Sequence, residues 1–190
     1  MMAADTGRLL WQRYFPPPDE PTLSTHLGGG PVFDNDVVIA ASGDGVIHAF
    51  DVKSGQLRWS IPRVKPTGPS LISPNRDFRA LTSSSGTLVS GSATGIVIGY
   101  DLRTREEKWR FHDVSISSTA FRFASAEGVA YIPYLSGMVV ALDAGTGLEL
   151  WRTGEWSAGF IWPPAFSGDR IIVSGSGHGY IALQRMHPKK

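Results

Sequence analysis

The feature that most constrains this chain is a short motif that ends in tryptophan and recurs along its whole length. Its fullest copy, Asp-Ala-Gly-Thr-Gly-Leu-Glu-Leu-Trp, ends at Trp151, and a second copy, Asp-Val-Lys-Ser-Gly-Gln-Leu-Arg-Trp, ends at Trp59. Four tryptophans close the motif, at intervals of 48, 50 and 42 residues: Trp11, Trp59, Trp109 and Trp151. Internal repeats with a period of roughly 40 to 50 residues indicate one supersecondary unit that is copied along the chain.

Each unit reads as a series of short antiparallel strands. Residues 37–42 and 46–50 are β-branched runs that flank Gly43-Asp44-Gly45, and glycine supplies the positive φ that a tight hairpin turn requires. The same layout recurs at residues 87–100 and 129–142, and a further strand is expected before each hairpin. The strand that ends in tryptophan is then the fourth and outermost of each unit. No segment has convincing helical periodicity.

Four-stranded units of this length are typical of β-propeller blades. We therefore predict an all-β protein, a β-propeller of four four-stranded antiparallel blades in one domain over residues 1–190. The last unit stops after its third strand, and the first motif begins with its second half, so the two ends are expected to share one blade. The predicted blades cover residues 24–59, 66–109, 117–151 and 160–184, the last completed by residues 3–13.

Composition excludes several classes of function. Lys and Arg number 18 against 17 Asp and Glu, so no basic surface for nucleic acid is expected. The absence of cysteine excludes disulfides, thiol catalysis and cysteine-ligated zinc. No run approaches the roughly 18 apolar residues of a membrane helix, so membrane insertion is not expected. Without an export signal the chain is expected in the cytoplasm, or in the periplasm or another extracytoplasmic space if it is part of a longer chain.

The motif resembles the Trp-docking repeat of the bacterial pyrroloquinoline-quinone-type (quinoprotein-like) β-propellers. The pattern of that family is Ala-x-Asp-x-x-Thr-Gly-x-x-x-Trp, and residues 141–151 fill it completely. Residues 49–59 fill it with Ser54 in place of Thr. In the third copy Gly99 replaces Ala and Arg105 replaces Gly, which is expected to change the shape of that turn. The WD40 propellers are a poorer match, because no Trp-Asp pair ends the strands.

The resemblance implies that the motif is structural. In the family each tryptophan is held against the neighbouring blade, beside a small Ala and a glycine turn. We therefore expect Trp11, Trp59, Trp109 and Trp151, with Gly7, Gly55 and Gly147, to join blades and not to form a catalytic site.

Ring closure allows three arrangements. The family's propellers usually have eight blades, and an eight-bladed ring needs half the rotation between neighbours that a four-bladed ring needs. The same flat Trp contact would leave gaps at the larger angle. We therefore favour two arrangements, a homodimer that completes one eight-bladed ring or half of a longer protein. A closed four-bladed monomer is the third possibility.

Ligands of propellers gather on one face, on the connectors between blades. The polar and aromatic residues on those connectors are the candidates for a ligand face: His26, Arg63, Lys65, His112, Asp113, Glu155, Trp156 and Trp162. The five histidines lack the spacing of a shared metal site, so no metal is expected. His112 and Asp113 are adjacent in extended chain and point in opposite directions, which disfavours a paired base and carboxylate.

Two functions follow from these observations. The first is a non-catalytic scaffold or sensor module, without a cofactor, that binds a protein, peptide or small ligand on one propeller face. The alternative is part of a pyrroloquinoline-quinone-dependent (PQQ-dependent) alcohol or sugar dehydrogenase. There the resemblance implies a quinone stacked on Trp156 or Trp162 and calcium near Glu155. A weaker reading is a hydrolase or lyase that uses His26, His112 and Glu155.

Overall fold

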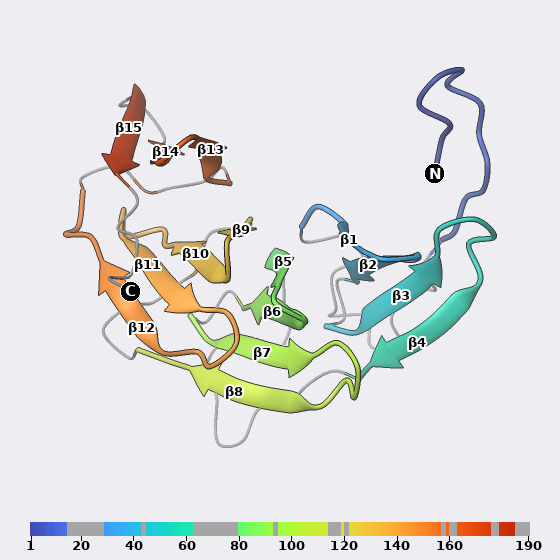
Figure 1. Ribbon diagram of the computed structural model, residues 1–190, viewed down its shortest axis with the longest axis horizontal. Coiled ribbons are helices and arrows are strands. Elements are labelled where there is room, and N and C mark those ends of the chain that lie inside the picture. Colours follow the sequence, from blue (N-terminus) through green and yellow to red (C-terminus); the bar gives the residue numbers. More distant parts are fainter. Residues whose placement is uncertain are drawn as a thin grey trace, which may run out of the picture.

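Four antiparallel sheets stand side by side in an open arc in the computed structural model (Figure 1). The structure describes residues 1–14, 29–42, 45–62, 80–92, 95–113, 119, 122–156, 159, 163–175 and 179–184. Every regular element in these ranges is a strand. The all-β propeller architecture predicted from the repeat is confirmed. No helix that could span a membrane occurs in the described part of the chain.

In each sheet the strands follow one another in chain order. The first sheet contains β1 (Val32–Asp34), β2 (Val37–Ala41), β3 (Ile47–Asp51) and β4 (Leu57–Ile61). The second contains β5 (Ala80–Ser84), β6 (Thr87–Gly91), β7 (Val97–Asp101) and β8 (Glu107–Phe111). The third contains β9 (Ala124–Ala126), β10 (Val129–Pro133), β11 (Val139–Asp143) and β12 (Glu149–Arg152). The fourth has three strands, β13 (Ala165–Ser167), β14 (Arg170–Gly175) and β15 (Gly179–Gln184).

The third and outer strands of the three complete sheets share one irregularity. Ala49 lies opposite Trp59 and Phe50 lies opposite Leu57, so the register shifts by one residue between the two pairs. The same shift occurs between β7 and β8 and between β11 and β12. A β-bulge increases the local twist and redirects side chains. It stands beside the tryptophan in every complete sheet.

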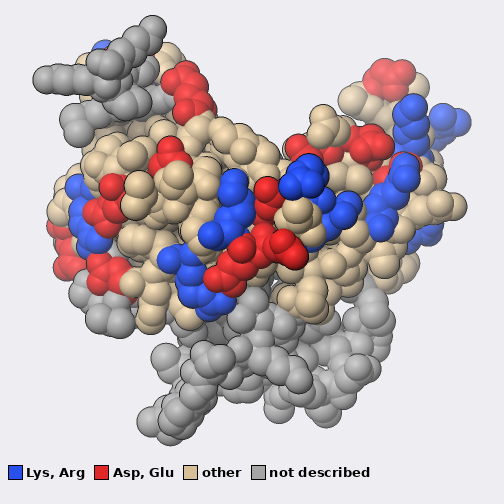
Figure 2. All heavy atoms as spheres, turned by 60° about the horizontal axis from the view of Figure 1, so that its bottom comes forward, with Lys and Arg blue, Asp and Glu red and all other residues tan. Residues whose placement is uncertain are grey.

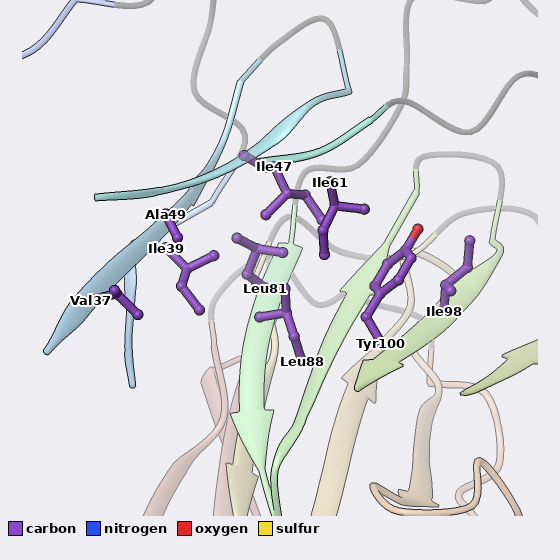
Figure 3. Close-up of a cluster of buried hydrophobic side chains, with 10 residues drawn as sticks. Val37, Ile39, Ile47, Ala49, Ile61, Leu81, Leu88, Ile98 and Tyr100 are labelled. Atoms are coloured by element: carbon purple, nitrogen blue, oxygen red, sulfur yellow. The ribbon is translucent and has the colours of Figure 1, made fainter. Parts of the chain in front are cut away.

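The hydrophobic core lies between neighbouring sheets. Ile39 and Ile47 of the first sheet pack against Leu81 and Leu88 of the second, and all four are almost completely buried (Figure 3). Similar clusters lie between the second and third sheets and between the third and fourth. Because strand side chains alternate between faces, each inner sheet contributes one face to each neighbour. The two end sheets each have one face without such a neighbour (Figure 1).

The N-terminal segment and the fourth sheet lie at opposite ends of the arc (Figure 1). Residues 1–14 lie beside β3 and β4, where Trp11 contacts Gly55. Among the described strands, β15 pairs with β14 alone. The predicted addition of residues 3–13 to the fourth sheet is therefore not made within one chain. Its completion by a second copy stays a prediction.

Candidate functional site: the docking turns and the two open ends

The turn that precedes each outer strand is built by an aspartate. In the first sheet Gly55 N donates to Asp51 O over 2.8 Å, and the Asp51 carboxylate accepts from Ser54 N at 2.7 Å and Ser54 Oγ at 2.8 Å. Asp143 accepts from Thr146 N and Oγ1 in the third sheet, each at 2.8 Å. Short hydroxyl and carboxylate side chains stabilise turns by such local bonds. The Asp and Thr or Ser of the motif thus shape the turn itself.

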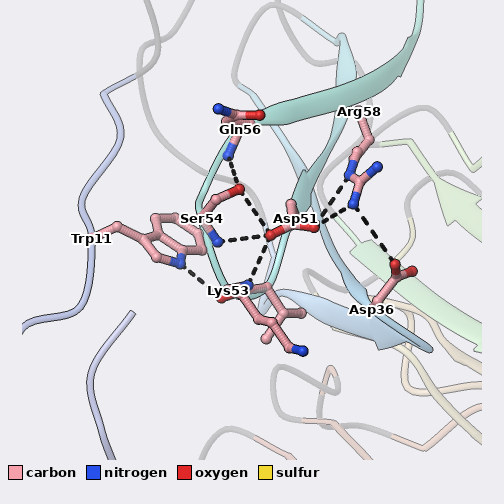
Figure 4. A network of polar contacts seen from close by, with 8 residues as sticks. Trp11, Asp36, Asp51, Lys53, Ser54, Gln56 and Arg58 are labelled. Carbon is pink, nitrogen blue, oxygen red and sulfur yellow. Dashed lines mark hydrogen bonds and ion pairs between the residues drawn. The ribbon is translucent and has the colours of Figure 1, made fainter.

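The charged state of Asp51 is strongly favoured by its partners (Figure 4). Arg58 Nη2 lies 2.5 Å from Asp51 Oδ2, and Ser54 donates from its backbone and its hydroxyl. Arg58 first, and then Ser54, hold the pKa of the Asp51 carboxyl well below its usual range. Hydrogen bonds from the backbone of Thr104 and Arg103 lower the pKa of Asp101 in the equivalent turn. These carboxylates are therefore charged at neutral pH.

The docking turns of the three complete sheets each receive the tryptophan of the preceding unit. Trp109 Nε1 donates to Ala144 O over 3.0 Å, from the second sheet to the third. A Cβ added to Gly147 would lie 2.5 Å from Trp109 Cδ2, which is closer than real Cβ atoms approach. Trp11 makes the same pair of contacts with the first sheet, where its Nε1 donates to Val52 O over 2.8 Å (Figure 4). In both turns the tryptophan thus contacts a backbone carbonyl and the glycine of the next unit.

The geometry of the third copy explains its two departures from the motif, Arg105 in place of Gly and Gly99 in place of Ala. Arg105 has φ +66, the same left-handed conformation as Gly55 and Gly147, and its N donates to Asp101 O over 2.7 Å. The expectation that Arg105 changes the turn is therefore wrong. Its guanidinium carbon lies 5.8 Å from the centroid of the Trp59 ring, a cation–π contact. At Gly99 an added Cβ would overlap the Trp109 ring, so the missing methyl lets that ring lie closer to its own sheet.

A fourth docking turn lies at the N-terminus. Gly7 has φ +66, and its N donates to Ala3 O over 2.8 Å, as in the other three turns. The bridge between Met2 and Leu9 repeats the pairing of Phe50 with Leu57. Yet no described heavy atom lies within 4 Å of a Cβ placed on Gly7. This turn is formed but carries no indole.

At the other end of the arc, the fourth sheet has no outer strand among the described residues. Tyr180 is 81% exposed, although Ile47, Val97 and Val139 in the same register position are at most 1% exposed. A cavity of about 280 Å³ lies at the end of β15 and the start of β14, lined by Asp169, Arg170, Ala182, Leu183 and Gln184. The other sheets carry an outer strand beside the strand that corresponds to β15. The two open ends are the parts of the described surface that most resemble an interface without its partner.

The structure describes half of the predicted ligand-face residues. Asp113 Oδ2 lies 2.6 Å from Arg152 Nη1, an ion pair between the connector after β8 and the end of β12. His112 and Glu155 are exposed, whereas Trp156 is half-buried in the cluster between the third and fourth sheets. No group of three or more His, Asp or Glu that could hold a metal lies in the described ranges. His26, Arg63, Lys65 and Trp162 lie outside the described residues.

Sequence reasoning missed the ion pairs of the outer strands. Arg110 pairs with Glu107 at 2.8 Å, and Arg152 pairs with Glu149 at 2.5 Å. The shared spacing Glu-x-Trp-Arg in β8 and β12 is the signal that could have found them. Figure 2 shows acidic and basic side chains interspersed over this outer surface. Exposed pairs of this kind contribute little stability, so they favour a solvated rim and not a binding site.

Comparison with known proteins identifies the family. The family model described as "Outer membrane protein assembly factor BamB" matches residues 1–151. A curated relative of that name from Bordetella pertussis is 23% identical, covering 93% of this chain and 55% of the relative. Another from Kangiella koreensis is 27% identical, covering 85% and 40%. The chain spans about half the length of the curated relatives it matches.

Solved structures share the fold. BamB from Moraxella catarrhalis has a TM-score of 0.71 and 23% identity, covering 96% of this chain and 54% of its own. The computationally designed Ika4 protein has a TM-score of 0.69 and 15% identity, covering 89% of this chain and all of its own. Together with the match over residues 1–151, these likenesses show that the chain belongs to the family of the outer membrane protein assembly factor BamB, which carries PQQ-type β-propeller repeats.

Proposed function

We propose that this chain is a non-catalytic β-propeller scaffold that binds protein partners during outer membrane protein assembly. Its family and its curated relatives are named for that process. The observation that carries the proposal is that the motif joins neighbouring units. Trp11 and Trp109 join neighbouring units through a carbonyl and a glycine, and neither contact needs a cofactor. The resemblance to quinoproteins thus supports shared packing and not shared chemistry.

We place the partner surface on the connector face. The connectors carry His112, Asp113 and Glu155, and the ion pair of Asp113 with Arg152 holds one connector against the next sheet. A connector fixed by a rigid sheet is a suitable place for recognition. The partner would be a protein or peptide, with a small ligand as the less favoured possibility.

We also propose an extracytoplasmic location. A factor that assembles outer membrane proteins acts beyond the inner membrane, and the curated relatives bear that name. This location is the one expected from the sequence if the chain is part of a longer protein. Fractionation of bacteria that produce the native gene product would test it, with recovery in the cytoplasm as the contradicting result.

The dehydrogenase alternative receives no support from the described residues. Trp156 packs in the cluster between the third and fourth sheets, and within the described ranges Glu155 belongs to no group of three or more His, Asp or Glu that could hold a metal. We propose that no quinone binds. Titration with PQQ and calcium, followed by the absorbance of the quinone and by thermal unfolding, tests this. Saturable binding with one quinone per chain would overturn the scaffold proposal.

A chimera tests the assembly role. The matched region of the Pseudomonas aeruginosa relative, which is 26% identical over 164 residues, is replaced by this chain in a strain that lacks its own copy. We expect outer membrane protein levels to rise toward those of the parent strain. If the chimera is produced and folded but the levels stay at those of the deletion strain, the proposed role is wrong.

Substitutions in the same chimera locate the surface. Changing His112 and Glu155 together to alanine alters two exposed connector side chains and is expected to reduce the recovery. Lys53→Ala alters an exposed side chain of a docking turn and serves as the matched control. Equal recovery by both variants would contradict the placement of the partner on the connector face. A homodimer that completes a ring is a separate proposal with its own geometry.

A further inference from the structure

We propose that two copies of this chain close one ring by exchanging their N-terminal segments. Residues 4–13 of each copy form the docking turn and the outer strand of the partner's fourth sheet. Trp151 of each copy then docks on Gly7 of the other. This inference concerns the isolated chain and does not depend on the proposed role in assembly.

The order of the docking contacts leads to this pairing. Trp11 docks on Gly55, Trp59 lies under Arg105, and Trp109 docks on Gly147. Each tryptophan thus meets the turn of the next unit. Trp151 comes next in this order, and within the described residues the fourth sheet ends at β15 without a docking turn of its own. The unused turn of the chain is the one at Gly7.

The Gly7 turn is already in the docking conformation. Its φ of +66 compares with +67 at Gly55 and +74 at Gly147. Gly7 is nevertheless exposed, whereas Gly55 is buried beneath Trp11. The turn thus has the docking conformation without an indole, and in the exchange the partner's Gln184 would take the place of Ala3, whose carbonyl now accepts from Gly7 N.

The fourth sheet lacks the groups that such a turn would supply. In the complete sheets, the residue that follows the aspartate of the motif donates its backbone N–H to the turn between the first two strands. Val52 N donates to Asp36 O over 2.8 Å, and Ala144 N donates to Gly128 O over 2.8 Å. By register the corresponding pair in the exchanged sheet is Ala4 N and Asp169 O. Asp169 lines the cavity at the edge of β15, where this turn would lie.

The end faces have the character of an inner interface. Tyr180 occupies the position that is covered by the next sheet in all three preceding units. Pairing the two ends would cover Tyr180 and an open strand edge, which proteins otherwise protect. The new contact continues the interface that already joins neighbouring sheets.

The curvature of the arc favours a second copy over closure by one chain. The arc superposes on 54% of BamB from Moraxella catarrhalis and on 45% of the designed Ika8 protein, so in both structures about as much chain again continues from it. It also covers the whole of the Ika4 protein, a chain of similar extent. A second copy would supply the missing half through a two-fold axis.

The exchange has one structural cost. In the single chain, Met1, Met2 and Ala3 pair with the strand that would pair with β15 after the exchange. Ala3 N, for example, donates to Arg8 O over 2.9 Å. These residues must leave so that Ala182 to Gln184 can take their place. The hydrogen bonds lost from the short N-terminal pairing are replaced by those of a longer strand pair, as between β11 and β12.

Mass in solution is the first test. Light scattering on a sizing column is expected to give twice the 20.6 kDa of one chain. A mass of one chain at all concentrations would overturn the proposal. The measurement uses no other protein, so its outcome is separate from that of the assembly experiment.

A designed disulfide tests the geometry. The chain has no cysteine, so Arg8→Cys with Gln184→Cys introduces only these two thiols in each copy, at exposed positions that correspond to Leu148 and Asp143 of the third sheet. Asp143 N donates to Leu148 O over 2.8 Å, which shows that these positions are neighbours. Oxidation is expected to give a covalent dimer on a non-reducing gel. A disulfide within one chain, or a dimer that does not cross-link, would overturn the exchange.

Matched variants complete the test. Lys53→Cys with Gln184→Cys places one thiol on a turn away from the exchanged strand and is expected to remain uncross-linked. Gly7→Ala adds a methyl beneath the docked indole and is expected to weaken dimerisation at least tenfold. Gly86→Ala introduces a methyl at φ +71 in a turn of the second sheet, again with nothing within 4 Å, and is expected to leave dimerisation unchanged. Equal effects of the two glycine variants would contradict docking at Gly7.

Discussion

The indole of Trp11 lies directly on Gly55, so that a Cβ on that glycine would be 2.5 Å from Trp11 Cδ2, while Trp11 Nε1 donates to the adjacent Val52 carbonyl over 2.8 Å. Trp109 repeats this relationship with Gly147 and Ala144. Glycine is thus required at this position of the motif for two reasons. Its backbone is left-handed, and the indole ring above it leaves no room for a Cβ. The two requirements can be separated by substitution.

Gly147→Ala is expected to destabilise the chain more than Gly86→Ala. Both glycines have positive φ, +74 and +71, so both variants incur the roughly 1 to 2 kcal/mol of a left-handed non-glycine residue. Gly147→Ala also forces its methyl against the Trp109 ring, which is expected to add about 1 to 3 kcal/mol. Urea unfolding followed by tryptophan fluorescence measures both. Equal midpoints would show that the ring moves aside without cost.

Trp109→Phe is expected to cost less than Trp109→Ala. Phenylalanine keeps an aromatic ring against Gly99 and Gly147 but loses the hydrogen bond from Nε1 to Ala144 O. The lost bond corresponds to about 1 kcal/mol, whereas the alanine variant is expected to lose about 3 kcal/mol through the cavity it leaves. Denaturant unfolding of the two variants checks this order. A phenylalanine variant as unstable as the alanine variant would assign most of the docking energy to the hydrogen bond.

Arg105→Gly is expected to be nearly neutral and Arg105→Ala destabilising. The φ of +66 favours glycine, but the guanidinium over the Trp59 ring contributes about 0.5 to 1 kcal/mol at an exposed site. Glycine relieves the strain as it removes the cation, whereas alanine removes the cation and retains the strain. Thermal unfolding of both variants provides the comparison. If alanine matches the parent, the cation–π contact adds nothing.

Tyr100 is expected to make the fold sensitive to alkali. Burial first, and then the charge of Glu107, raises the pKa of Tyr100 from 10.0 to about 12. Because the folded state holds this proton more tightly, its contribution is fully present below pH 10 and is lost as the pH rises toward about 12. Tyr100→Phe should flatten the stability profile in this window. Burial also raises the pKa of Tyr134, so some alkaline sensitivity should remain.

Asp51 is expected to govern part of the acid response. Arg58 and Ser54 hold its folded pKa below the ordinary value of 3.8, so its contribution is present above that value and is lost as the pH falls below it. Asp51→Asn should therefore lower stability at neutral pH and weaken the decline below about pH 4. Unfolding midpoints measured from pH 7 to pH 2 test this. Parallel profiles for the parent and the variant would contradict a role for this carboxylate.

The strands and the docking turns could be predicted from the sequence because they depend on local chemistry. Alternating β-branched residues specify strands, and an aspartate followed three residues later by Ser or Thr closes its own turn, as Asp51 does with Ser54. Arg105 shows the limit of this reasoning. Its backbone can be held left-handed by the rest of the turn, so the side chain alone did not reveal the conformation.

The ligand-face residues show a second limit. Asp113 was considered beside His112 because the two are adjacent in sequence, but its partner in the structure is Arg152, 39 residues away. Trp156 was considered for a quinone, yet it packs between two sheets. Which charge meets which, and which aromatic ring is covered, depends on the placement of whole sheets.

The sequence by itself determined the repeat, the strand order within each unit and three of the four docking turns, because these features arise from residues close together in the chain. The tertiary structure decided the curvature of the arc, which of the tryptophans has a turn beneath it, and that Gly7 and β15 lie at opposite ends. These features depend on how apolar faces of separate sheets fit together, since a small rotation at each interface accumulates along the arc. The local pattern fixes each interface, and only the packed sheets place the two ends.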